Sequence, residues 1–196
     1  ISDGVVHLGV SSEFYQNIIK KNIIKKENTI LYAGRLVSVK GVKKLIEALS
    51  ILEKKDIKYK LLIAGNGPDE FELKNYFNKN NLNVEFLGRV SQKELVEYYI
   101  SSEIFVSLNP SEPFGIVFPE ALLSQCKIVC PYTGGQVEYL SDYSNSVAFV
   151  DETDEKSIAL GIEKLLSRGE IPKLTNEQMK SYTYEEISKN ILKYIK

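Results

Sequence analysis

An alternation of short apolar runs with segments of helical spacing is the feature that most constrains this chain. The runs contain few charged residues, as expected of strands that are buried on both faces of a sheet. They span residues 29–33, 59–64, 84–87, 104–108, 128–130 and 147–150. Strands that alternate with helices form parallel βαβ units with right-handed crossovers. We therefore predict an α/β fold with a doubly wound, Rossmann-like parallel sheet of six strands.

Between the runs, apolar residues recur at the three- and four-residue spacing of amphipathic helices. The clearest helical face comprises Val42, Leu45, Ile46, Leu49 and Leu52. A second face is predicted for Phe71, Leu73, Tyr76 and Phe77. Such faces indicate helices that cover the two sides of the sheet.

Composition excludes several classes of protein. A chain of 196 residues with a net charge of -1 has no overall basic field for nucleic acid. The two cysteines, Cys126 and Cys130, are too few for a disulfide framework and fit a reducing cytosol. A single histidine, His7, argues against histidine-based metal sites and serine–histidine triads. No run of about 18 apolar residues occurs, so we expect a cytoplasmic protein without a membrane-spanning helix.

Ligands of open α/β sheets bind beyond the carboxyl ends of the strands, so the loops after the strands are the places to search. Unusual residues follow the first, second, fourth and fifth predicted strands, and we expect these loops on one edge of the sheet. Gly34 and Arg35 follow the first strand, and Lys40 precedes the next helix. Arginine and lysine together suit a phosphate. The alternative is a pair of solvated surface cations.

The second strand is followed by Gly65-Asn66-Gly67-Pro68, which resembles the start of a dinucleotide-binding fingerprint. That fingerprint needs a third glycine at position 70, where this chain has Glu70. A redox Rossmann domain therefore loses support. A tight strand-to-helix turn remains the simplest interpretation, in which glycine allows the backbone to approach a ligand.

A helix start is predicted within residues 115–118, because Pro119 fits only the first turn of a helix. The free amides of Gly115, Ile116 and Val117 would then form an anion site beside the loop. Glutamates bracket this helix start.

Glu112 lies before the helix and Glu120 lies just inside it. Two acids beside an anion site are compatible with it if each binds hydroxyl groups instead of the phosphate. The alternative is that Glu120 complements the helix dipole and that Glu112 is solvated.

Taken together, these segments resemble the C-terminal nucleotide-sugar-binding domain of retaining glycosyltransferases of the group 1 type (family 4), which have the GT-B fold. The resemblance covers about residues 4–166 and is carried by 32–41 (YAGRLVSVKG), 61–68 (LLIAGNGP), 84–90 (VEFLGRV) and 132–140 (YTGGQVEYL). The most specific segment is 111–121 (SEPFGIVFPEA), where Glu112 and Glu120 stand at the family's Glu-x7-Glu spacing.

The resemblance implies catalytic roles for four residues. Arg35 and Lys40 would bind the donor diphosphate and stabilise it as the leaving group. Glu112 would contact hydroxyl groups of the donor sugar, and Glu120 would contact the ribose hydroxyls. The amides of residues 115–117 would hold the distal phosphate, and the base would pair with main chain around residues 89–90. The donor-binding positions implied in this way are Gly34, Gly65, Arg89, Val90, Phe114, Gly115, Ile116 and Val117.

The resemblance also implies an organisation of the whole protein. Residues 1–14 are expected to be a hinge from an N-terminal domain that this chain lacks. Residues 15–173 would form the nucleotide-sugar-binding domain, and residues 174–196 a helical segment that crosses back to the absent domain. The partners would be a UDP- or GDP-sugar donor and a glycan, lipid or small-molecule acceptor bound by the absent domain. Peripheral membrane contact of the full-length protein stays open.

No Asp-x-Asp metal motif occurs, so we expect no cofactor and no metal. Three other functions remain as alternatives. A non-catalytic nucleotide-sugar-binding module would keep the same residues. A GT-B nucleotide-sugar epimerase uses acidic residues and histidine in its interdomain cleft, and His7 is the single histidine of this sequence. A flavodoxin-like signalling domain needs an acidic pocket after the first strand, where this chain has Arg35. The isolated chain is expected to be inactive in sugar transfer.

Overall fold

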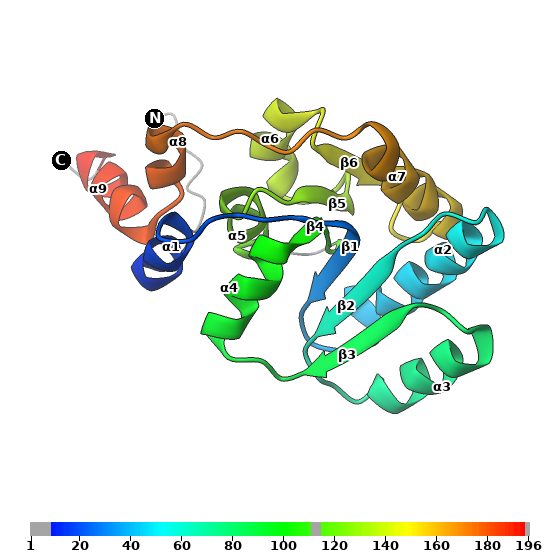
Figure 1. Cartoon of the computed structure of the whole chain (residues 1–196). Coiled ribbons are helices and arrows are strands. Elements are labelled where there is room, and N and C mark those ends of the chain that lie inside the picture. The colour runs from blue at the N-terminus through cyan, green and yellow to red at the C-terminus, as the bar shows by residue number, and fades with distance from the viewer. Residues whose placement is uncertain (1–8, 111–114, 195–196) are drawn as a thin grey trace.

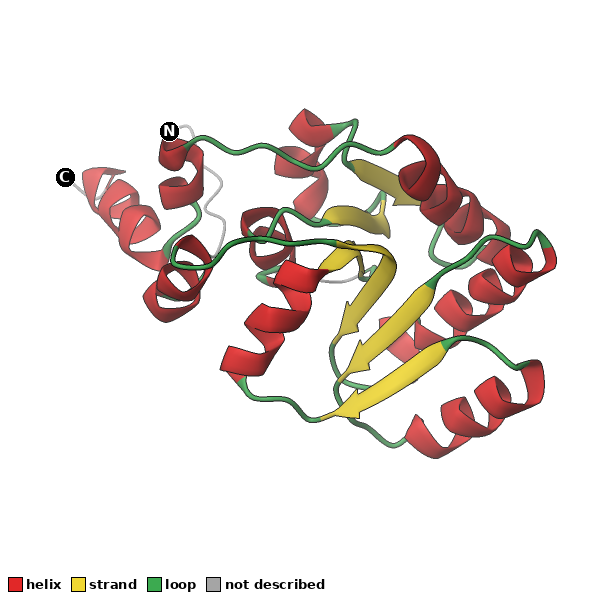
Figure 2. Cartoon of the chain, in the orientation of Figure 1, coloured by secondary structure: helices red, strands yellow, loops and turns green. Residues whose placement is uncertain are grey.

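The computed structural model describes residues 9–110 and 115–194, and it contains one parallel sheet with helices on both faces (Figure 1, Figure 2). The sheet has six strands in the order β3-β2-β1-β4-β5-β6, which confirms the predicted fold class. The strands are β1 (Lys26–Ala33), β2 (Lys60–Ala64), β3 (Val84–Gly88), β4 (Ser102–Val106), β5 (Lys127–Pro131) and β6 (Val147–Val150).

Helices connect the strands and cover both faces of the sheet. They are α1 (Ser12–Ile19), α2 (Val42–Lys54), α3 (Glu70–Asn80), α4 (Gln92–Ser101), α5 (Val117–Leu123), α6 (Gln136–Leu140), α7 (Glu155–Arg168), α8 (Asn176–Ser181) and α9 (Tyr184–Tyr194), with 3-10 turns η1 (Ser38–Lys40) and η2 (Ser141–Tyr143). Buried residues of α2, α3 and α7 share one apolar core, and those of α1, α4 and α5 share the other. No helix in the described ranges is long and apolar enough to cross a membrane.

The central strand β1 illustrates why the apolar runs become strands. Ile30 points into one core and Leu31 into the other, and both side chains are fully buried. A strand with both faces covered needs apolar residues at successive positions. Each core therefore takes alternate residues of the same run.

The chain reverses its winding direction at β1. Leu31 pairs with Leu62 of β2 on one side and with Phe105 of β4 on the other. Loops that leave these strands diverge to opposite faces, which opens a crevice at the carboxyl ends. The fold therefore places a ligand site above β1 and β4.

Some boundaries and orientations differ from the prediction. The fourth strand runs over Ser102–Val106 and not over 104–108. Phe71 was predicted on the buried face of its helix, but it is 78% exposed. The core contacts of α3 come from Leu73 and Phe77, which are one helical turn apart. Phe71 lies in the first turn of α3, off this stripe, so the sheet does not cover it.

The two ends of the described chain meet away from the sheet. The Val10 amide donates to the Tyr182 carbonyl at 2.7 Å, and Val10 pairs with Thr183 in a short parallel bridge. Figure 1 shows α1, α8 and α9 grouped at this end of the molecule. The domain boundary expected after residue 14 falls inside α1, where Phe14 is buried in the core.

Candidate functional site

Three loops at the carboxyl edge of the sheet are held side by side by backbone hydrogen bonds. The Gly34 amide donates to the Ala64 carbonyl at 2.9 Å, and the Gly65 amide donates to the Gly88 carbonyl at 2.8 Å. The loops after β1, β2 and β3 therefore form one continuous floor.

Glycine is required where these loops touch. A Cβ atom on Gly65, whose φ is +139°, would lie 1.9 Å from the Gly34 carbonyl oxygen. A Cβ atom on Gly67 would lie 2.1 Å from the Leu36 carbonyl oxygen. The tight turn predicted after the second strand is thus a close approach of two backbones.

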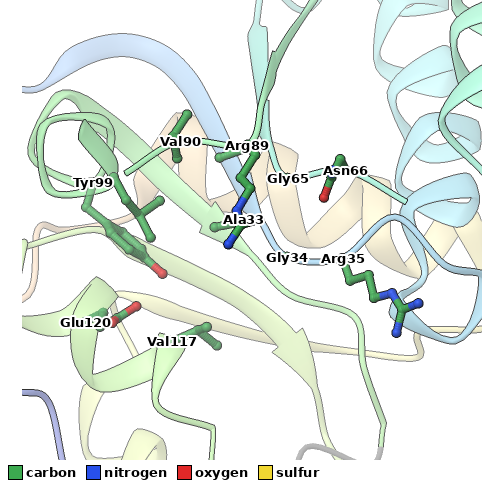
Figure 3. Close-up of a pocket in the computed structure, with 12 residues that line it drawn as sticks. Ala33, Gly34, Arg35, Gly65, Asn66, Arg89, Val90, Tyr99, Val117 and Glu120 are labelled. Carbon is green, nitrogen blue, oxygen red and sulfur yellow. The ribbon is translucent and has the colours of Figure 1, made fainter. Parts of the chain in front are cut away.

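A pocket of about 480 Å³ opens above this floor (Figure 3). The predicted site residues that line it are Gly34, Arg35, Gly65, Arg89, Val90, Val117 and Glu120. The lining residues that sequence reasoning missed are Ala33, Ala64, Asn66, Leu95 and Tyr99. The structure thus brings together residues from the loops after β1, β2 and β3 with residues of α4 and α5.

Cationic side chains come from the β1–α2 and β3–α4 loops. Arg35 is exposed, and the Tyr32 hydroxyl donates to its carbonyl oxygen at 3.0 Å, which orders the backbone at that position. Arg35 and Glu120 lie on opposite sides of the pocket, with Arg89 between the two sides (Figure 3). Lys40 ends η1 and is half-buried, but it does not line this pocket.

Helix α5 begins at Val117, inside the predicted interval. The Phe118 amide donates to the Gly115 carbonyl at 2.9 Å, and the Glu120 amide donates to the Ile116 carbonyl at 3.1 Å. The amides of residues 115–117 precede this hydrogen-bond pattern, as in any first helical turn. Gly115 has a φ of +56°, a backbone conformation that residues with a side chain rarely adopt.

Glu120 is buried at the inner wall of the pocket, with 8% of its surface exposed. Burial raises the pKa of its carboxyl to about 7, and Tyr99 and Gln92 oppose only part of this rise. The group is therefore divided between its neutral and ionised forms near neutral pH. A ligand that offers hydroxyl groups favours the ionised form, because a carboxylate accepts several hydrogen bonds.

Some predictions fall elsewhere. Glu112 and Phe114 lie outside the described residues, as does His7. The loop after β5, predicted on the same edge of the sheet, does not line the pocket, whereas Arg89 and Val90 in the loop after β3 line it as the resemblance implied. In the part of the chain that the structure describes, no three His, Cys, Asp or Glu residues cluster as a metal site would require.

The sequence did not predict Tyr99 as a site residue, because its sequence context is typical of a core residue. It lies on α4 four residues after Leu95, and the helical spacing of these two apolar residues predicts only burial. Both residues line the pocket as well as contacting the core.

Comparisons with known proteins give a consistent result. A family model described as "Glycosyl transferases group 1" matches residues 14–186. An uncharacterized glycosyltransferase of Methanocaldococcus jannaschii is 34% identical over 165 residues, which are 83% of this chain and 42% of that protein. This chain therefore spans less than half the length of that relative.

Solved structures share the fold. Sucrose-phosphate synthase from Thermosynechococcus elongatus matches with a TM-score of 0.76 at 19% identity, over 98% of this chain and 51% of that one. HepE of Anabaena, solved in complex with UDP and glucose, matches with a TM-score of 0.73 at 18% identity, over 98% of this chain and 56% of that one.

Proposed function

This chain belongs to the group 1 glycosyl transferases, and we propose that it is the donor-binding half of an enzyme that transfers a sugar from a nucleoside diphosphate sugar. One observation carries the proposal. The pocket has the Arg35 guanidinium on one side and the buried Glu120 carboxyl on the other, with Arg89 and apolar residues between them. A nucleoside diphosphate has the complementary groups: an anionic diphosphate, a ribose with two hydroxyls and a flat base.

The diphosphate is assigned to Arg35, Lys40 and the amides of residues 115–117. Breaking the bond between sugar and phosphate leaves negative charge on the diphosphate, and positioned donors that stabilise this charge lower the barrier. Arginine can bind two phosphate oxygens at once, while lysine acts as a point charge. The proposal includes no metal in this step, since the cationic residues and amides supply the positive potential.

The nucleoside is assigned to the inner part of the pocket. The Glu120 carboxylate would accept hydrogen bonds from the ribose hydroxyls. The base would lie against Val90 and Leu95 and would pair with main chain near Arg89. This assignment is supported by the depth of Glu120, which is buried where a ribose between base and diphosphate would reach it.

The sugar and the acceptor are assigned on the resemblance in residues 111–121. Glu112 and Phe114 would contact the donor sugar, and the same resemblance favours retention of the anomeric configuration. The acceptor, a glycan, lipid or small molecule, would bind to the N-terminal domain that relatives of this family carry. Catalysis by orientation needs both partners in place. This chain alone should therefore bind the donor without transferring its sugar.

Isothermal titration calorimetry of this chain tests the proposal with UDP, GDP and ADP and with UDP-glucose and GDP-mannose. We expect saturable binding with one nucleotide per chain for at least one base, and no release of free sugar or of a transfer product. Absence of binding for all five ligands at millimolar concentration would overturn the donor-binding role. Sugar transfer by this chain alone would contradict the proposal that transfer also requires the N-terminal domain.

A further inference from the structure

Tyr99 lines the pocket and, like Ser102 and Ser124, is a fully buried residue whose hydroxyl is unpartnered among the described residues. Buried hydroxyl groups without partners are few in native proteins, and each one calls for an explanation. The hydroxyl belongs to a residue that lines the pocket, so a functional explanation is available.

Packing fixes the direction of this hydroxyl. The Tyr99 ring contacts Phe14 edge-on at a centroid distance of 5.9 Å and Phe105 at 5.3 Å. The backbone is also held, because the Lys25 ammonium donates to the Tyr99 carbonyl oxygen at 2.9 Å. The ring cannot turn toward another partner without disturbing the core.

The hydroxyl is directed toward the Glu120 carboxyl group (Figure 3). It lies outside the geometry of a hydrogen bond, but it is near enough to lower the pKa of that carboxyl against the effect of burial. Burial raises the pKa of the Tyr99 hydroxyl well above its ordinary value, so the hydroxyl stays protonated and can only donate to an anion.

Other polar and charged groups also face this part of the pocket. Gln92 of α4 interacts with the Glu120 carboxyl, and Arg35 and Arg89 line the same pocket from the β1–α2 and β3–α4 loops. Gln92 is exposed, whereas Tyr99 is fixed in the core. Tyr99 is therefore the group best placed to orient the carboxylate.

We propose that Tyr99 is a positioning residue: its hydroxyl donates a hydrogen bond to one oxygen of the ionised Glu120 carboxylate and leaves the other oxygen for the hydroxyl groups of the ligand. The proposal rests on the proposed function, in which those hydroxyl groups belong to the ribose of a nucleoside diphosphate. No proton moves between the two side chains. A small shift of Glu120 closes the hydrogen bond when the ligand favours the ionised form.

The test compares the wild type with Tyr99→Phe, which keeps the ring and its contacts. UDP-glucose is the calorimetric probe, because its diphosphate does not titrate between pH 6 and pH 8. Wild-type affinity should rise about tenfold over this range, since the carboxyl with a pKa of about 7 must ionise to bind. Tyr99→Phe should lower the affinity at pH 7 by about 3- to 10-fold and move the midpoint of the profile to higher pH.

A second measurement needs no ligand. Carbon-13 NMR of the glutamate carboxyl carbons follows Glu120 directly, and the resonance is assigned by its loss in Glu120→Gln. We expect Tyr99→Phe to raise the midpoint of this titration. In the Glu120→Gln background, the additional Tyr99→Phe change should leave the affinity for UDP-glucose unchanged, as expected of coupled residues.

Tyr98→Phe is the matched control, because Tyr98 lies on the same helix but does not line the pocket. It should move neither the midpoint nor the affinity. A Tyr99→Phe protein that melts like the wild type and shows an unshifted Glu120 titration would overturn the positioning role. Failure of the wild type to bind any of the five nucleotides would instead overturn the proposed function, and the NMR titration would still decide the role of Tyr99.

Discussion

Gly65 lies so close to Gly34 that a Cβ atom on Gly65 would be 1.9 Å from the Gly34 carbonyl oxygen. The two glycines belong to the loops after β2 and β1, which form the floor of the pocket. Their contact depends on the absence of a side chain, and the backbone of Gly65 has a φ of +139° that disfavours any other residue. The floor of the site is therefore sensitive to a single methyl group.

Gly65→Ala should destabilise the protein by at least about 2 kcal/mol, because the added methyl group forces the two loops apart and the backbone is strained. Urea unfolding followed by circular dichroism measures the effect. Gly135→Ala is the control, since a Cβ atom there meets nothing within 4 Å. Its effect should stay within about 0.5 kcal/mol. Equal stabilities of the two variants would contradict the close contact.

Glu120→Gln should stabilise the protein at high pH. The folded-state pKa of about 7 lies above the ordinary value of 4.5, so ionisation costs the folded protein stability as the pH rises through this interval. Glutamine removes that cost and should add up to about 3 kcal/mol at pH 8, but little at pH 4.5. Thermal melts across this range measure the difference. The exposed Glu177→Gln variant should follow the wild type at both ends of the range.

Arg35→Ala should weaken UDP binding by about 10- to 100-fold, as expected for the loss of charge-assisted hydrogen bonds. The affinity for uridine, which has no phosphate, should change little. Calorimetry with both ligands separates the two effects. Lys43→Ala removes a cation of α2 that pairs with Glu72 outside the pocket, and it should leave UDP binding unchanged. A loss of affinity for both ligands in Arg35→Ala would contradict its assignment to the diphosphate.

The two glutamates of the Glu-x7-Glu spacing should respond differently. Glu120→Gln should weaken binding of UDP itself by roughly 1.5–3 kcal/mol, because the ribose hydroxyls lose a charged acceptor. Glu112→Gln should leave UDP affinity nearly unchanged and weaken only UDP-glucose, since it is assigned to the sugar. Calorimetry on both variants with both ligands distinguishes the roles. Equal weakening of UDP in the two variants would show that the role assignment is wrong.

Residue types and their spacing predicted the secondary structure and much of the site. Apolar runs predicted the parallel strands, because polar and charged side chains are unfavourable in a strand that is buried on both faces. Pro119 predicted the start of α5 because its ring lacks the N–H that an interior helical position requires. Arg35 and Glu120 were predicted at the carboxyl edge, and both line the pocket. These are local consequences of residue type, and neighbouring residues suffice to derive them.

Which of these elements contact one another could be seen only from the packing of the whole fold. The β3–α4 loop lines the pocket and the β5–α6 loop does not, and for the β3–α4 loop only the family resemblance, not the residue types, predicted this. The packing of the helices also places Tyr99, which was predicted only as a core residue, in the wall of the pocket beside Glu120. The same packing leaves Phe71 exposed. Such contacts join segments far apart in the sequence. They depend on how the two cores pack across the sheet, which local spacing does not specify.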